Sequence, residues 1–191
     1  LIELIGAALS FIVFIQDYSL FRAVGVSLFH SVASFNNAGF DIFGGGQSMV
    51  PYADNIFLNI ITCVLIFFGG IGFLVIQELW QKKCQWKKLS MHTKVVLSVS
   101  LALIIIGTLL IKLTEPVSWL CALFHCVSTR TAGFASRPIG DFGAPALLVM
   151  IVLMFIGASS GSTGGGIKTS TFFVLIRGIF SAATNQSEKA F

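Results

Sequence analysis

Residues 29–40 read FHSVASFNNAGF, and residues 124–134 read FHCVSTRTAGF, so the chain carries two near copies of one motif. Each copy follows an apolar stretch, ends in Ala-Gly-Phe and leads through polar residues into a further apolar run. The glycines of the two copies, Gly39 and Gly133, lie 94 residues apart. We interpret each copy as a short helix that enters a membrane and ends in a turn whose backbone carbonyls meet an ion.

The composition points to a membrane protein. Of 191 residues, 55% are hydrophobic and only 10% are charged, whereas a soluble domain carries roughly 25% charged residues. There are too few charges for a solvated exterior and enough apolar residues for several spans. We therefore expect an all-α integral membrane protein that passes the membrane more than once and is surrounded by lipid.

Basic residues crowd the connection between residues 78 and 94, where Glu78 is the one acidic residue. The lysines of this connection are Lys82, Lys83, Lys87, Lys88 and Lys94. By the positive-inside rule, a lysine-rich loop beside membrane spans is cytoplasmic. Because the dense run of basic residues is limited to this one loop, we expect no nucleic acid as a partner.

The lengths of the apolar runs separate spans from shorter helices. Runs at 55–79 and 94–113 are long enough to cross a bilayer, which takes about 20 helical residues. The runs at 20–34 and 117–128 are too short, so we expect re-entrant half-helices there, each followed by polar residues. Further helices are expected at 1–15, 142–157 and 168–184.

The order of span, half-helix, loop and span therefore occurs twice, in the manner of a channel built from pore loops. We assign one helix–pore loop–helix repeat, with a truncated first helix, to 1–79, a basic cytoplasmic loop to 80–93, and a second repeat with a broken final helix to 94–191. With the basic loop in the cytoplasm, both half-helices enter from outside, and their C-terminal ends point into the membrane. The negative end of a helix dipole favours a cation there.

The turns after the half-helices are the candidate ion-binding residues, and they make up a candidate selectivity filter. Glycine permits backbone angles that other residues resist, and the neighbouring side chains are short or neutral, so main-chain oxygens would bind the ion. An ordinary helix cap that ends in glycine is the alternative. The candidate residues are Asn36, Asn37, Ala38, Gly39, Phe40, Thr131, Ala132, Gly133 and Phe134.

A Gly-rich break at 158–167 interrupts the last apolar stretch. Glycine costs roughly 1 kcal/mol relative to alanine in a helix interior, so five glycines within 157–166 cannot sustain a helix, and the hydroxyls and freed carbonyls need water or an ion path. A lysine near mid-membrane is costly, so Lys168 must face a cavity, reach the interface or bind a carbonyl or acid. A surface linker is the alternative. The break supplies a second set of candidate site residues: Gly157, Ser159, Ser160, Gly161, Ser162, Thr163, Gly164, Gly165, Gly166 and Lys168.

Two enzyme-like patterns overlap this break. Gly157–Gly161 matches G-x-S-x-G, which requires a preceding strand and an Asp/His pair. Residues 161–169 approach a P-loop, but Ile167 displaces the lysine that should follow the second glycine. His30 and His125 occupy equivalent places in the half-helices without acidic or Cys partners at matching spacing. We therefore expect no enzyme, no catalytic residue and no metal site other than a cation at the filter carbonyls.

The two motif copies, together with FIGASSGSTGGGIKT (155–169), resemble the Trk/Ktr/HKT superfamily of potassium transporters, most closely the membrane subunit of bacterial Ktr systems. That family has four repeats around one pore, with one filter glycine in each pore loop. The resemblance implies that Gly39 and Gly133 are filter glycines, that 158–167 is the gate, and that the chain is a fragment covering about two of the four repeats.

The resemblance also implies a function and partners. It implies K⁺ transport across the plasma membrane, coupling to Na⁺, a homodimer and a cytosolic nucleotide-binding regulatory subunit, with no covalently bound cofactor. Two other functions stay open: a non-conducting accessory subunit, and a secondary transporter with a midplane site at the broken helix.

Overall fold

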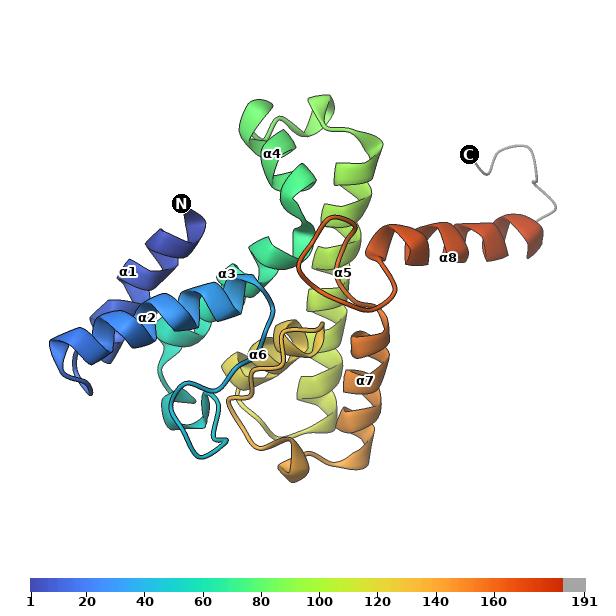
Figure 1. Cartoon of the computed structure of the whole chain (residues 1–191). Helices are drawn as coiled ribbons and strands as arrows, with labels where there is room; N and C mark the ends of the chain where they lie inside the picture. Colours follow the sequence, from blue (N-terminus) through green and yellow to red (C-terminus); the bar gives the residue numbers. More distant parts are fainter. Residues whose placement is uncertain (184–191) are drawn as a thin grey trace.

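The computed structural model describes residues 1–183, and in these residues the secondary structure is helical, with no strand. The eight α-helices are α1 (Ile2–Phe14), α2 (Leu20–Phe35), α3 (Ile56–Ile71), α4 (Phe73–Gln81), α5 (Met91–Thr114), α6 (Trp119–Thr129), α7 (Ala144–Phe155) and α8 (Thr169–Ala183) (Figure 1). Single 3₁₀ turns occur at Val50–Tyr52, Trp86–Lys88 and Ile139–Asp141. The expected all-α fold is confirmed.

The helices form two groups that meet along α3 and α6. Helices α1 and α2 pack side by side and against α3, while α6 and α7 pack against the long α5 (Figure 1). One apolar core joins the groups, because Phe14, Leu58 and Phe124, from α1, α3 and α6, are fully buried in the same cluster. Helix α8 projects away from this body, and Thr169 is its one buried residue.

The lengths of the helices show which of them could cross a membrane. Among the described residues, α5 is the one single helix that is both long and apolar enough to cross a bilayer. Helices α3 and α4 meet the same criterion only when they are counted together as one bent span. The half-helices expected at 20–34 and 117–128 correspond to α2 and α6, which are short and apolar.

The continuous helix expected over 55–79 is wrong, because the chain bends by 96° between α3 and α4. Gly72 takes a left-handed φ of 89° at the bend. A Cβ atom there would lie 2.8 Å from the carbonyl oxygen of Ser160, and Ser159 donates its amide to the carbonyl of Gly70 at 2.9 Å. The Gly-rich loop thus donates to a carbonyl at the end of α3 that would otherwise accept a hydrogen bond from the next helical turn. The missing side chain of Gly72 lets the loop approach this closely.

Other helix ends depart from expectation by a few residues. Helix α5 begins at Met91 because Ser90 caps it, accepting the Thr93 amide at 3.3 Å. Helix α6 begins after Ser118, which accepts the Cys121 amide at 3.1 Å. The last helix, expected to reach residue 184, is seen to Ala183, and residue 184 lies outside the described residues.

Candidate ion-binding turns and the loop that contacts them

The turns that follow α2 and α6 meet at their glycines. A Cβ atom on Gly39 would lie 2.3 Å from the carbonyl oxygen of Ala132 and 3.0 Å from the Cα of Gly133. Gly39 and Gly133 have φ angles of 63° and 87°. Both the left-handed backbone and the close approach require glycine at position 39. The structure therefore brings together residues that the motif repeat predicts to act together.

The two turns share an unusual backbone. Asn37 and Thr131 also have positive φ, 52° and 88°, two residues before the glycines. In each turn, amides fold back onto the end of the half-helix: Ala38 donates to the Ala33 carbonyl at 2.9 Å, and Ala132 donates to the Ser128 carbonyl at 2.9 Å. The glycines are predictable from the sequence, but a non-glycine residue in a left-handed conformation leaves no sequence signal as strong.

Most carbonyl oxygens of the turns lack a hydrogen-bond donor in the part of the chain that the structure describes. Across the described residues, no hydrogen-bond donor reaches the carbonyls of 36–40 or of 131–133, whereas the carbonyl of Phe134 accepts a hydrogen bond from the Ser128 hydroxyl. A carbonyl without a protein donor must be satisfied by water or by a cation. The free carbonyls thus lie in the segments that the sequence singles out.

Burial differs between the two turns. Phe40 is 63% exposed, whereas Phe134 is 3% exposed and packs in the core. Ala38 and Asn36 are exposed in the first turn, while Ala132 is buried in the second. The first turn therefore presents a face that the described residues do not cover.

The Gly-rich loop between α7 and α8 makes hydrogen bonds with both turns. Asn37 donates its side-chain amide to the Thr163 hydroxyl at 2.8 Å, and the amide of Gly165 donates to the Thr131 hydroxyl at 3.1 Å. The Thr163 hydroxyl also lies 3.0 Å from the carbonyl of Phe35, the last residue of α2. The predicted gating residues thus lie against the predicted filter residues.

Close packing explains Gly157 and Gly164 in this loop. A Cβ atom on Gly157 would lie 1.9 Å from the carbonyl oxygen of Gly165, and one on Gly164 would lie 2.6 Å from the Thr131 hydroxyl. The amide of Ala158 donates to the Gly165 carbonyl at 3.1 Å, which folds the loop back on itself. Gly161 and Gly166 have positive φ angles of 73° and 76°.

The polar side chains of the loop find partners within the chain. Ser159 donates to the Ile71 carbonyl and Ser162 to the Ser159 carbonyl, at 2.5 and 2.6 Å. The hydroxyl oxygens of Ser160 and Ser170 form a hydrogen bond at 3.1 Å. Lys168 donates to the carbonyl of Gly164 at 2.7 Å, which is the carbonyl partner among the alternatives expected for it.

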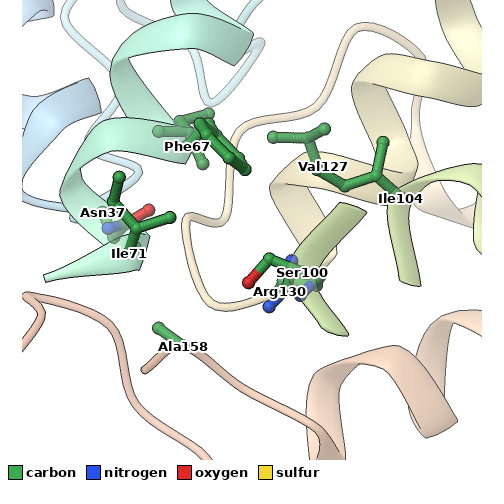
Figure 2. A pocket seen from close by; sticks show the side chains of 10 residues that line it. Asn37, Phe67, Ile71, Ser100, Ile104, Val127, Arg130 and Ala158 are labelled. Carbon is green, nitrogen blue, oxygen red and sulfur yellow. The ribbon is translucent and has the colours of Figure 1, made fainter. Parts of the chain in front are cut away.

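Arg130, the residue between α6 and the second turn, is not among the site residues predicted from the sequence. Its guanidinium donates from Nη2 to the carbonyl of Gly157 at 3.2 Å, and it lines a small cavity together with Asn37 (Figure 2). A feature of the sequence does point to Arg130, because a charged side chain directly before the turn costs free energy in a membrane unless it has a specific role there.

The half-helix histidines pack among aromatic rings. His30 lies 2.9 Å from the Thr62 hydroxyl and edge-on to Phe134, and His125 lies edge-on to Phe142. In residues 1–183, no three His, Cys, Asp or Glu side chains gather to hold a metal ion.

The chain is similar to known transport proteins. A family model described as TrkH, cation transport protein, matches residues 1–190. The chain is 43% identical over 164 residues to Ktr system potassium uptake protein B of Vibrio alginolyticus, covering 78% of this chain and 35% of that protein. It is 35% identical over 186 residues to potassium/sodium uptake protein NtpJ of Enterococcus hirae, covering 92% of this chain and 41% of that protein.

A solved structure shares the fold. The crystal structure of the potassium transporter TrkH from Vibrio parahaemolyticus superposes with a TM-score of 0.74 at 22% identity, covering all of this chain and 41% of that one. The chain spans less than half the length of the Vibrio alginolyticus and Enterococcus hirae proteins. These relatives are ion transport proteins rather than enzymes. The match over nearly its whole length shows that the chain belongs to the TrkH family of membrane cation transport proteins.

Proposed function

We propose that this chain forms part of a K⁺ uptake pathway, in which the turns at 36–40 and 131–134 supply carbonyl oxygens to the ion. The observation that carries the proposal is the meeting of Gly39 and Gly133, with free carbonyls on both sides of the contact. Carbonyl oxygens that replace the hydration shell select ions by cavity size and by the number of dipoles. The C-terminal ends of α2 and α6 add negative potential at the same place.

The pathway needs more turns than two. We propose that 1–79 and 94–191 are two helix–pore loop–helix repeats, joined by the cytoplasmic loop 80–93, and that repeats outside this chain complete the ring. The exposed Phe40 and Ala38 support this proposal, because they leave one side of the first turn open for further residues.

The Gly-rich loop is the proposed gate. It lies against both turns through Thr163 and Gly165, so it can obstruct an ion that leaves them. Its two contacts with the turns are single hydrogen bonds, each worth about 0.5–1.5 kcal/mol net. Breaking these bonds frees the part of the loop around Gly165 from the turns, while the bonds of Ser159 to α3 hold its first residues in place.

The relatives suggest the ion and the partners. The names of two relatives specify potassium uptake and potassium/sodium uptake, which supports K⁺ as the transported ion and leaves a role for Na⁺ as part of the proposal. The Ktr system named for the first relative supports a transporter that works with a regulatory subunit. A homodimer in the plasma membrane, with a cytosolic nucleotide-binding regulator at the cytoplasmic face, completes the proposal.

Replacing Gly133 by serine in the full-length protein tests the proposed filter. A Cβ atom at Gly133 would meet the Gly39 Cα at an ordinary 3.7 Å, so the substitution strains the backbone without a collision. Gly44 is the matched control, because its φ of 91° is similar and nothing lies within 4 Å of its Cβ position. We expect Gly133→Ser to lower the K⁺/Na⁺ uptake ratio and Gly44→Ser to preserve it.

The opposite outcomes are decisive. Normal K⁺ uptake with normal selectivity in Gly133→Ser would favour a non-conducting accessory role for the turns. Uptake of organic solutes that competes with K⁺ would favour a secondary transporter with a midplane site.

A further inference from the structure

A cavity of about 20 Å³ lies where α3, α5, α6 and the Gly-rich loop meet. Figure 2 shows Asn37, Arg130 and Ala158 around it, with Phe67 and Val127 on its apolar side. A cavity needs roughly 10–15 Å³ to hold one water molecule, together with polar groups that bind it. The cavity therefore has room for a single water.

Two polar atoms of the lining residues are buried without a partner. In the part of the chain that the structure describes, neither Asn37 Oδ1 nor Arg130 Nε has a hydrogen-bond partner. Asn37 is 8% exposed. A buried donor or acceptor left unpaired costs about 1–3 kcal/mol, so each atom strongly favours a ligand.

The opposite end of each side chain is already held. Asn37 donates from Nδ2 to Thr163, at 2.8 Å, and Arg130 donates from Nη2 to the Gly157 carbonyl, at 3.2 Å. These bonds fix the rotation of both groups, so Oδ1 and Nε cannot turn to other partners without losing them.

The chemistry of the pair selects the ligand. Arg130 Nε–H is a donor and Asn37 Oδ1 is an acceptor. Water accepts from the first and donates to the second. A cation would be repelled by the guanidinium, and an anion would face the lone pairs of Asn37 Oδ1.

We infer that one water molecule bridges Arg130 Nε and Asn37 Oδ1, and that Arg130 is thereby a positioning residue for the first turn. The bridge connects the Gly157 junction, the second half-helix and the first turn in one chain of hydrogen bonds. Its effect on ion selection rests on the proposed function. The position equivalent to Arg130 in the first copy of the motif is Asn36, whose Nδ2 donates to Glu3 Oε1 at 3.0 Å. The first copy therefore has no arginine to form such a bridge.

A double-mutant cycle in the full-length protein tests the bridge, with the K⁺/Na⁺ uptake ratio as readout. We expect Arg130→Gln and Asn37→Ala each to lower the ratio roughly three- to ten-fold. The double variant should lower the ratio by less than the product of the two single effects, because the loss of the bridge is shared while the bonds to Thr163 and Gly157 are lost separately. Independent, multiplying effects would overturn the inference.

Two further variants separate the bridge from charge and from general damage. Arg130→Lys keeps the charge but lacks the second donor of the planar fork, so we expect it to stay impaired. Full restoration by lysine would show that charge alone suffices and would overturn the bridge. Arg137→Gln is the matched control, since Arg137 donates to the Asp141 carbonyl at 3.1 Å, outside the cavity lining.

Density in the unaltered full-length protein decides the matter if the variants fail to fold. At high resolution, we expect one water peak within about 3.2 Å of both Arg130 Nε and Asn37 Oδ1. A dry cavity, or a direct contact between the two side chains, would overturn the inference. This result is independent of the proposed filter, because unchanged selectivity in Gly133→Ser would refute the filter and leave the water peak to be found.

Discussion

Asn37 and Thr131 lie 94 residues apart, have left-handed backbones, and each forms a side-chain hydrogen bond with the Gly-rich loop. Asn37 donates to the Thr163 hydroxyl, and Thr131 accepts from the Gly165 amide. Equivalent positions of the two motif copies thus form hydrogen bonds with the same segment, the Gly-rich loop. A movement of this loop must break a bond to each turn, which couples the proposed gate to the proposed filter.

Thr163→Val should loosen the gate. The valine loses the hydrogen bond from Asn37 and the one to the Phe35 carbonyl, while its volume is nearly unchanged. We expect a higher basal rate of Rb⁺ uptake by proteoliposomes, because the loop loses its hydrogen bond to the first turn. Ser162→Ala is the control, because Ser162 donates to the Ser159 carbonyl within the loop. Equal rates in both variants would contradict the assignment.

Gly164→Ala should disturb the contact between loop and turn far more than Gly165→Ala. A Cβ atom on Gly164 would lie 2.4 Å from the Ala158 Cβ and 2.6 Å from the Thr131 hydroxyl, whereas one on Gly165 would meet its nearest neighbour at 3.9 Å. We expect uptake to change several-fold in the first variant and little in the second, as measured by ion flux at matched protein amounts. The reverse order would show that the packing of Gly164 against the second turn does not govern transport.

Gly72→Ala should destabilise the protein. The new Cβ atom would lie 2.8 Å from the Ser160 carbonyl, at a residue whose φ is 89°. Strain of this kind costs roughly 1–3 kcal/mol, so we expect a lower midpoint of thermal unfolding in detergent. Gly70→Ala, whose Cβ would contact Ala158 at an ordinary 3.9 Å, provides the comparison. An unchanged midpoint for Gly72→Ala would mean that α3 and α4 can straighten without loss.

The repeat made the short helices and the paired glycines predictable. The spacing of the two Ala-Gly-Phe sequences located α2, α6, Gly39 and Gly133, because hydrophobic length and glycine position are local properties. The same reasoning identified the break at 158–167 but took its hydroxyls to need water or an ion path, whereas Ser159 binds helix carbonyls.

The bend at Gly72 and the role of Arg130 could not be read in the same way. The run Gly69-Gly70-Ile71-Gly72 does signal a weak helix, yet the bend depends on Ser159 and on the Gly161 carbonyl, which accepts the Phe73 amide at 3.1 Å. The bond from Arg130 to Gly157 likewise joins residues 27 positions apart. Such partners are set by tertiary packing, which a single sequence does not specify.

Ion density in the full-length protein is the measurement on which the proposal stands or falls. Crystals or frozen grids prepared in Rb⁺ should show an ion ringed by the free carbonyl oxygens of the turns, within reach of Gly39 and Gly133. Turns that lie in bulk solvent or pack away from a central axis, with ions bound elsewhere, would contradict it.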